Sequence, residues 1–189
     1  WIFDMGASAT QVNGTLRNNW GAVWGNFSGV ENISVTGSNR LFVYVGNGDN
    51  VITGGSGGAD LVDYRYAVAG VNVNLATGVV TGGSGNDTLS GIEVVSYGSH
   101  YNDTLIGTAG NNELHGGQGA DYLDGGAGID KAWYDQYNSG SVTVSLMSQG
   151  INSALGIVFT DVAAGDQLFN IEQLVGSGYN DFLYGDGGT

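Results

Sequence analysis

The sequence contains no cysteine and no proline, and only four of its 189 residues are lysine or arginine. Without cysteine, disulfide bonds and thiolate metal sites are excluded. Glycine is abundant, with 36 residues, but a collagen-like triple helix is excluded because it needs proline and a strict three-residue glycine period. The basic residues face 18 acidic ones, which gives a formal net charge of −14 at pH 7. This balance argues against nucleic acid and anionic membrane surfaces as partners and favours cations.

A long apolar run and a catalytic motif are also missing. No apolar stretch approaches the roughly 18 residues of a membrane span, and no N-terminal signal peptide is visible. The chain begins at Trp1 and ends within a further glycine-rich unit, so we expect a piece of a longer protein. There is no HExxH motif, His100 and His115 are not spaced for zinc, and no Ser, His and Asp set is supported. We therefore expect no enzymatic activity in this chain.

The most regular stretch, from Gly98 to Trp133, consists of four nine-residue units laid end to end. Each unit opens with glycine and carries an apolar residue at its eighth position; the sixth positions hold Asp103, Asn112, Asp121 and Asp130. Glycine lets the backbone adopt positive φ and approach an ion or another backbone closely. The apolar residue can point inward from a short strand, so each unit is predicted to be a loop followed by a strand.

If two units complete one coil of 18 residues, Asp103 stacks on Asp121 and Asn112 stacks on Asp130, with coils roughly 4.8 Å apart. Stacked carboxylates repel one another, so this arrangement needs a cation. Carboxylate and carbonyl oxygens are the ligands that Ca²⁺ takes, six to eight at a time. The repeat therefore predicts a calcium-binding stack of coils.

The units between Gly82 and Asp130, such as GGSGNDTLS and GGQGADYLD, resemble the RTX, or haemolysin-type calcium-binding, family. The likeness continues over 163–187 and, in degenerate form, over 1–62. It implies an all-β fold of parallel β-roll (β-solenoid) segments, stacked in an elongated array, with Ca²⁺ between successive loops. It also implies a bacterial protein that is secreted by the type I route and folds in extracellular calcium.

The repeats divide the chain into three expected modules, at 1–62, 63–133 and 134–189, the last truncated at its C-terminal end. In the first module Phe42, Asn50 and Asp60 stand where the metal-binding carboxylate is expected, in units one of which is a residue short and another a residue long. Two of the three carboxylates are missing, so we expect this module to bind one Ca²⁺ weakly or none.

Two segments of alternating polarity, 71–80 and 141–150, predict longer strands that join one roll to the next. Segment 151–169 is expected to pair with the second of them as a hairpin.

The candidate metal ligands are the sixth-position residues and the glycines of their loops. Asp87 precedes Asp103 by 16 residues rather than 18, and a shortened half-coil would place it in one column with Asp103 and Asp121. Asp166 and Asp181 are expected to repeat the arrangement in the last module. The complete set is Asp60, Asp87, Asp103, Asn112, Asp121, Asp130, Asp166, Asp181, Gly98, Gly116, Gly119, Gly125 and Gly128. The alternative is that the acids are Asx-turn residues that accept hydrogen bonds from their own backbone.

A longer repeat places an apolar residue and Glu a few positions before Gly-Ser, at Glu31, Glu93 and Glu172. These glutamates either cap the stack as ligands or accept hydrogen bonds from backbone donors where a strand changes direction. We favour the second interpretation.

Two functions remain open at this point. The first is the structural region of a secreted repeat protein, such as an adhesin, a surface layer or an extracellular filament, in contact with flanking repeats or neighbouring copies. The second is a non-catalytic calcium-binding module of a secreted enzyme of the protease or polysaccharide-epimerase type. The ten tyrosines and four tryptophans either fill joints between rolls, which we favour, or bind polysaccharide.

Overall fold

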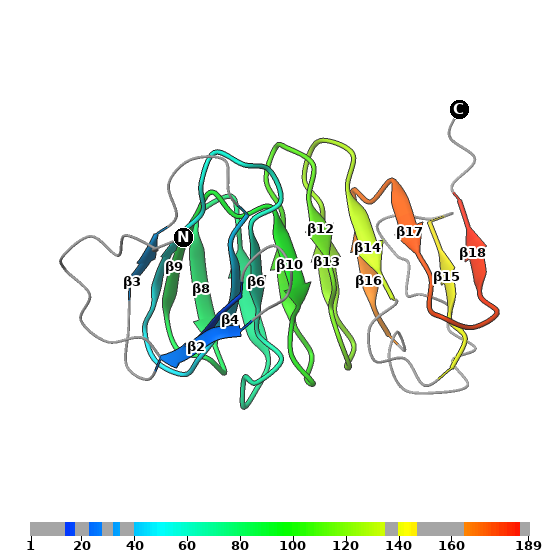
Figure 1. Ribbon diagram of the computed structural model, residues 1–189. Helices are drawn as coiled ribbons and strands as arrows, with labels where there is room; N and C mark the ends of the chain where they lie inside the picture. Colours follow the sequence, from blue (N-terminus) through cyan, green and yellow to red (C-terminus); the bar gives the residue numbers. More distant parts are fainter. Residues whose placement is uncertain are drawn as a thin grey trace.

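The computed structural model describes residues 14–17, 23–27, 32–34, 40–134, 140–146 and 165–185. Within these ranges the chain forms strands, turns and bends, and no helix long and apolar enough to cross a membrane is found. Figure 1 shows the strands side by side along an elongated stack, with the N-terminal strands at one end and β18 at the other. The prediction of an all-β fold of stacked coils is confirmed.

Two eight-stranded sheets make up most of the stack. The first contains, in spatial order, β17 (Gln173–Val175), β14 (Lys131–Trp133), β12 (Glu113–Leu114), β10 (Val94–Tyr97), β6 (Leu61–Asp63), β4 (Phe42–Val45), β1 (Gly14–Arg17) and β2 (Val23–Phe27). The second contains β16 (Gln167–Phe169), β13 (Tyr122–Asp124), β11 (Thr104–Ile106), β7 (Val71–Asn74), β8 (Val79–Gly82), β9 (Asp87–Ser90), β5 (Val51–Thr53) and β3 (Asn32–Ser34). A separate two-stranded sheet pairs β15 (Thr143–Ser145) with β18 (Phe182–Tyr184).

Successive nonapeptides alternate between the two large sheets. Strand β11 pairs in parallel with β13, so that Leu105 lies opposite Leu123. Strand β12 pairs in the same way with β14, so that Leu114 lies opposite Ala132. Both pairs are offset by two units, which confirms the predicted 18-residue coil.

The core is a thin layer with one inward apolar side chain from each short strand. Leu105, Leu114, Leu123 and Ala132 occupy the eighth positions and are fully buried, whereas their strand neighbours are partly exposed. Burying one such leucine contributes roughly 1.5–3 kcal/mol. Since each strand buries so little apolar surface, the contacts between coils at the turns matter for stability.

Segment 71–80 is not one longer strand, as expected from its alternation, but the antiparallel hairpin of β7 and β8. Gly78 adopts φ +71°, and Asn74 Oδ1 accepts the backbone N–H of Thr77 at 2.9 Å, so the chain reverses direction between them. The hairpin lies between β11 and β9 in the second sheet.

The tyrosines differ in exposure. Tyr64, which directly follows β6, and Tyr97, which ends β10, are fully buried, whereas Tyr66 is 68% exposed. Part of the aromatic content therefore fills joints between coils, as favoured from the sequence.

The large sheets run across the expected module boundaries. Strand β6 pairs with β4 and β10, and β14 pairs with β17. Strand β15 pairs in parallel with β18. Residues 147–164, which include most of the expected hairpin over 151–169, lie outside the described part of the chain.

Candidate metal centre

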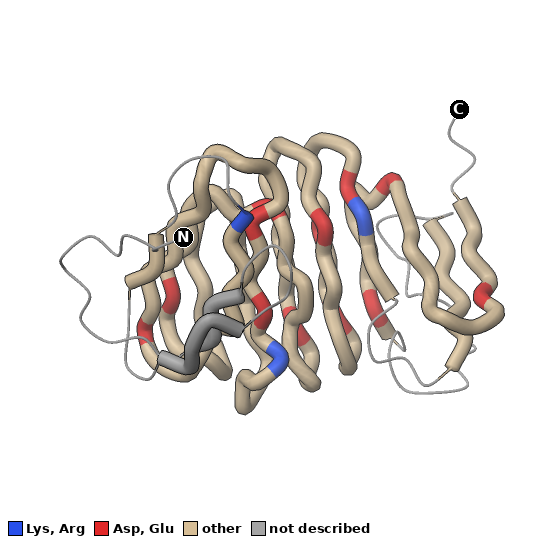
Figure 2. Tube along the Cα trace, viewed as in Figure 1, with Lys and Arg blue, Asp and Glu red and all other residues tan. Residues whose placement is uncertain are grey.

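The sixth-position residues lie immediately before or at the start of their strands, and most of them, together with two glutamates, form two rows. Row A, along the second sheet, consists of Asp103, Asp121 and Asp166. Row B, along the first sheet, consists of Asp60, Glu93, Asn112, Asp130 and Glu172. The predicted stacking of Asp103 on Asp121 and of Asn112 on Asp130 is confirmed. Figure 2 shows acidic residues recurring on coil after coil, with few basic residues among them.

In row A each carboxylate accepts the backbone N–H of its neighbour on the adjacent coil. Asp166 Oδ1 accepts the N–H of Asp121 at 2.8 Å, and Asp121 Oδ1 accepts that of Asp103 at 2.8 Å. Asp103 Oδ1 continues the series by accepting the N–H of Val71 in the hairpin at 2.7 Å. The row is thus a ladder of hydrogen bonds that joins successive coils.

Row B follows the same rule except at Asn112, whose Nδ2 donates to the carbonyl of Glu93 at 3.1 Å. Glu172 Oε2 accepts the N–H of Asp130 at 2.8 Å, and Asp130 Oδ1 accepts that of Asn112 at 2.7 Å. Glu93 Oε2 accepts the N–H of Asp60 at 3.0 Å. The favoured interpretation of the repeated glutamates as acceptors for backbone donors is confirmed for Glu93 and Glu172; Glu31 lies outside the described residues.

The second carboxylate oxygens of three aspartates have no hydrogen-bond partner. Asp60 Oδ2, Asp121 Oδ2 and Asp130 Oδ2 are buried and unpartnered. Leaving a buried acceptor unsatisfied costs about 1–3 kcal/mol, and more where the group is charged. These oxygens therefore need a proton or a cation.

In three units the second residue donates a hydrogen bond to the sixth-position side chain. Where this residue is Ser or Thr, its hydroxyl donates to the sixth-position side chain: Ser99 to Asp103 at 2.7 Å, Thr108 to Asn112 at 3.0 Å and Ser177 to Asp181 at 2.6 Å. The units of the three unpartnered aspartates begin Gly-Gly and lack this donor. In these three units the Gly-Gly start leaves an oxygen free for a ligand, whereas Asp87, whose unit also begins Gly-Gly, accepts the hydroxyl of Ser84 at the third position.

The opening glycines leave space for oxygen atoms from two coils. A Cβ on Gly98 would lie within 3.0 Å of both Asp103 Oδ2 and the carbonyl oxygen of Gly116 on the next coil. A Cβ on Gly116 would likewise approach Asp121 Oδ2 within 3.0 Å. We call such a place an oxygen cradle: an opening glycine, the acid of its own unit and, where one approaches, a carbonyl of the next coil.

The fourth-position glycines have a different role. Gly119 and Gly128 adopt φ +127° and +125°, and a Cβ on Gly119 would clash with the backbone of Tyr101 on the adjacent coil. They let the turns of successive coils pack closely.

Burial and mutual repulsion raise the pKa values of the row A acids. Burial is the main cause for Asp103, whose pKa is raised to about 6 although it accepts hydrogen bonds from Val71 and Ser99. Burial, followed by the charges of Asp166 and Asp103, raises the pKa of Asp121 further. The pKa of Asp166 is raised mainly by burial as well. Without a cation, this row resists full ionisation.

A hard divalent cation fits this chemistry. The described residues contain no group of three or more His, Cys, Asp or Glu side chains that could hold a metal together, so an ion here would take most of its ligands from backbone carbonyls. Ca²⁺ accepts carboxylate and carbonyl oxygens in flexible geometry. The buried unpartnered oxygens and the cradles beside them meet that demand.

The prediction that Asp87 lies in one column with Asp103 is wrong. Strands β9 and β11 lie in the same sheet, but β7 and β8 stand between them, so Asp87 and Asp103 are not on adjacent strands. Asp87 instead faces Asn50, whose backbone and side-chain N–H groups both donate to Oδ1 at 2.8 Å, and Ser84, whose hydroxyl donates to Oδ2 at 3.2 Å.

Two further placements differ from expectation. Asp166 extends row A, but Asp181 precedes β18 in the small sheet and accepts the N–H of Val142 at 2.8 Å, so the two do not stack on each other. In the first module Leu41 rather than Phe42 lies opposite Asp60, since β4 and β6 pair Phe42 with Leu61. Leu41 turns inward and is buried, which explains the shift by one residue.

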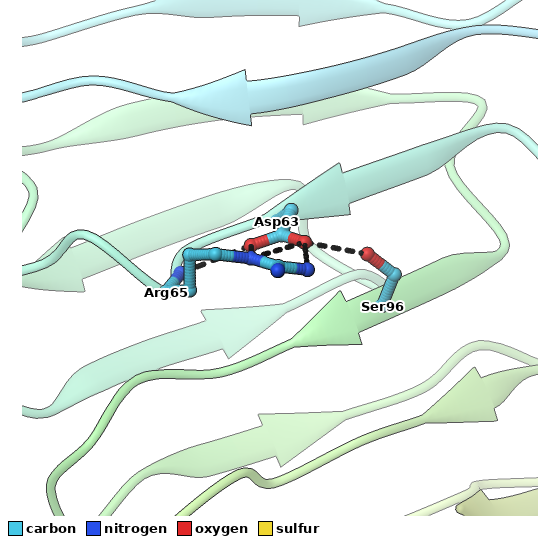
Figure 3. Close-up of polar contacts among 3 residues, drawn as sticks. All are labelled: Asp63, Arg65 and Ser96. Atoms are coloured by element: carbon cyan, nitrogen blue, oxygen red, sulfur yellow. Dashed lines mark hydrogen bonds and ion pairs between the residues drawn. The ribbon is translucent and has the colours of Figure 1, made fainter. Parts of the chain in front are cut away.

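One buried charge was not found from the sequence. The side chain of Asp63 is fully buried at the end of β6, where it pairs with Arg65 and accepts the hydroxyl of Ser96 at 3.1 Å (Figure 3). Arg65 Nε donates to Asp63 Oδ1 at 2.8 Å, and its guanidinium lies 5.0 Å from the ring centre of Tyr44. The spacing Asp-x-Arg was the only sequence signal, and it is common. The guanidinium of Arg65 therefore neutralises this buried carboxylate, so Asp63 needs no metal ion.

Fold and site together define a class: a parallel β-solenoid whose coils are joined by stacked acids and whose glycine turns present oxygen cradles to a cation. The family model of the RTX calcium-binding nonapeptide repeat matches the chain in four copies, over 42–62, 79–91, 97–132 and 170–189. The chain therefore carries the repeats of the RTX family, which bind Ca²⁺, and the resemblance noted from the sequence is confirmed. No curated protein matches the chain.

Proposed function

We propose that this chain is the calcium-dependent structural region of a secreted bacterial protein, in which Ca²⁺ between successive coils neutralises rows A and B. The observation that carries the proposal is the set of buried, unpartnered oxygens of Asp60, Asp121 and Asp130 beside glycine cradles. An ion that binds only the folded chain stabilises it by RT ln(1 + [L]/Kd). At the Kd of about 10⁻⁴–10⁻³ M typical of extracellular modules, the chain folds outside the cell.

The proposed primary ligands are these three carboxylates, with backbone carbonyls of the loops opened by Gly116 and Gly125. Gly98, Gly119 and Gly128 shape the same turns. The side-chain oxygens of the remaining candidates already accept hydrogen bonds, so they would bind the ion only by displacing those donors. The aspartates among them also add negative charge. These candidates are Asp87, Asp103, Asn112, Asp166 and Asp181.

A role in an extended assembly at the cell surface, as in an adhesin or filament, is the finer part of the proposal. Leu183 of β18 is 42% exposed, whereas its counterpart Leu123 is fully buried. Phe182 and Tyr184 on the same strand are exposed as well. This apolar strand supports packing of a further coil, from flanking repeats or a neighbouring copy, against β18.

Far-UV circular dichroism during a Ca²⁺ titration, followed by EDTA, tests the proposal. Strand signal and stability should grow with Ca²⁺ and fall, without vanishing, in EDTA, and the Ca²⁺ midpoint should rise in Asp130→Asn. Asp124→Asn is the matched control, because Asp124 is partly exposed and its Oδ1 accepts hydrogen bonds that an amide oxygen can also accept. Identical spectra and stability in EDTA and Ca²⁺ would contradict calcium-dependent folding.

A further inference from the structure

Two turns of row B are shorter than the nonapeptide loop. In each, a residue with positive φ is followed by a buried isoleucine and then by glutamate: Gly91 (φ +62°) with Ile92 and Glu93, and Asn170 (φ +50°) with Ile171 and Glu172. In a full nonapeptide, five residues of the glycine-rich loop precede the acid. These two turns reach the same row with fewer residues and a longer acidic side chain.

The first turn packs on the loop of Asp60 through four contacts. Gly54 N donates to the carbonyl of Ser90 at 2.8 Å, and Asp60 N donates to Glu93 Oε2 at 3.0 Å. The N–H groups of Glu93 and Val94 both donate to the carbonyl of Asp60, at 3.2 and 3.1 Å.

The second turn repeats these contacts on the loop of Asp130. Gly125 N donates to the carbonyl of Phe169 at 3.0 Å, and Asp130 N donates to Glu172 Oε2 at 2.8 Å. The N–H groups of Glu172 and Gln173 donate to the carbonyl of Asp130 at 3.1 and 2.9 Å. The same geometry thus occurs twice in the chain.

Each short turn, together with the glycine-rich loop on which it packs, encloses an oxygen cradle. A Cβ on Gly54 would lie within 3.0 Å of Asp60 Oδ2 and of the Gly91 carbonyl oxygen. A Cβ on Gly125 would lie equally close to Asp130 Oδ2 and the Asn170 carbonyl oxygen. Asp60 and Asp130 are 0% exposed, and their Oδ2 atoms have no partner. A buried anionic oxygen beside a carbonyl oxygen requires a proton or a cation.

Glutamate adds a second negative charge to each cradle. Its Oε2 is used by the backbone, whereas no hydrogen bond or ion pair to Oε1 of Glu93 or Glu172 is found among the described residues. The charge of Glu172 also helps to raise the pKa of Asp130, after burial. Arg40 donates to the carbonyl of Ala59 at 2.9 Å, next to Asp60, and has no counterpart described at Asp130.

We propose that these two turns form a second kind of Ca²⁺ site, in which an Asp of a glycine-rich loop and a Glu of a short turn share one ion. This inference rests on the proposed calcium-dependent function and extends it to a residue type and turn that the nonapeptide pattern does not contain. The site of Asp60 and Glu93 gives the degenerate first module an ion. It should be the weaker of the two, because the charge of Arg40 opposes a cation nearby.

Glu93→Gln and Glu172→Gln, made singly in the full chain, test the proposal. Gln retains an oxygen acceptor for the N–H of Asp60 or Asp130 but removes the charge. Equilibrium dialysis against saturating Ca²⁺, with metal analysis, measures bound ions per chain. Each variant should lose about one ion while keeping the parent's circular dichroism in excess Ca²⁺. Glu113→Gln is the control, because Glu113 pairs with Lys131 at 3.0 Å outside the row and should bind as the parent does.

A dialysis result for Glu93→Gln and Glu172→Gln equal to the parent's would overturn the inference and leave these glutamates as backbone acceptors only. Asp121→Asn, measured in parallel, separates this from the proposed function. If Asp121→Asn loses an ion and the glutamate variants do not, only the second kind of site is wrong. If the parent binds no Ca²⁺, the proposed function fails first. If a variant folds only in part in excess Ca²⁺, the number of ions bound per folded chain decides the outcome. A number equal to the parent's contradicts the proposal.

Discussion

Asp121 accepts the backbone N–H of Asp103 with Oδ1 at 2.8 Å and keeps Oδ2 buried without a hydrogen bond. One oxygen therefore joins two coils, whereas the other is left for something outside the chain. Since Asp166 and Asp103 both add negative charge nearby, the metal-free coil is held under repulsion that a cation would remove.

Asp121→Asn should stabilise the metal-free protein and weaken its response to calcium. The amide keeps an oxygen for the N–H of Asp103 and replaces the unpartnered Oδ2 with a neutral group. We expect the free energy of unfolding in EDTA to rise by about 1–3 kcal/mol, and the gain on adding Ca²⁺ to shrink. Urea unfolding with and without Ca²⁺ measures both. A variant less stable than the parent in EDTA would show that Oδ2 is already satisfied.

Metal-free stability should fall as the pH rises from about 6.5 to about 8.5. An acid whose folded pKa lies above its unfolded value stabilises the fold at low pH, and this stabilisation is lost as the pH rises through the folded pKa. Asp166 and Asp121, whose pKa values are raised to about 7 and about 9, act in this direction across the window, whereas the contribution of Asp103, with a pKa of about 6, is largely lost below it.

His115 acts in the opposite direction, since burial lowers its pKa to about 3 from 6.5 and its stabilisation is lost only as the pH falls below 6.5. The chosen window avoids that contribution. Thermal unfolding in EDTA across the window measures the effect, and saturating Ca²⁺ should abolish it. A melting temperature in EDTA that rises with pH would contradict the repulsion in row A.

The sequence was enough to predict the coils because the repeat encodes them locally. Glycine at the first position, an acid at the sixth and an apolar residue at the eighth fix turn, row and core in the same nine residues. The pairing of Asp103 with Asp121 follows from this spacing alone.

Contacts that depend on insertions were not predictable. The hairpin of β7 and β8 lies between the strands of Asp87 and Asp103. Nothing in the local sequence indicates whether such an inserted hairpin pairs within the sheet or projects from it. The pairing of Asp63 with Arg65 was not predictable for another reason. It depends on the burial of Asp63 beside Ser96 of β10, a contact between distant parts of the sequence.

Gly98→Ala should destabilise the coil and occlude its cradle. The added Cβ would lie within 3.0 Å of Asp103 Oδ2 and of the Gly116 carbonyl oxygen, so either the turn or the oxygens must move. We expect a loss of about 1–3 kcal/mol, as for overpacking, and weaker Ca²⁺ binding. Gly110→Ala is the control, because its Cβ would meet only Thr108 Oγ1 at 3.7 Å. Equal unfolding midpoints for the two variants would show that the cradle has room for a methyl group.

Arg65→Gln should destabilise the protein in a way that calcium does not repair. Its loss leaves the Asp63 carboxylate, fully buried between β6 and β10, without its cation, although Ser96 still donates to it (Figure 3). Removing one partner of a buried pair costs about 3–5 kcal/mol. The loss should be the same in EDTA and in saturating Ca²⁺, because this carboxylate ends a strand and lies outside rows A and B. Arg40→Gln, at an exposed arginine, is the control in EDTA, where it should change the free energy of unfolding little. Urea unfolding in both conditions decides the matter, and recovery of the Arg65 variant by Ca²⁺ would place Asp63 among the calcium ligands instead.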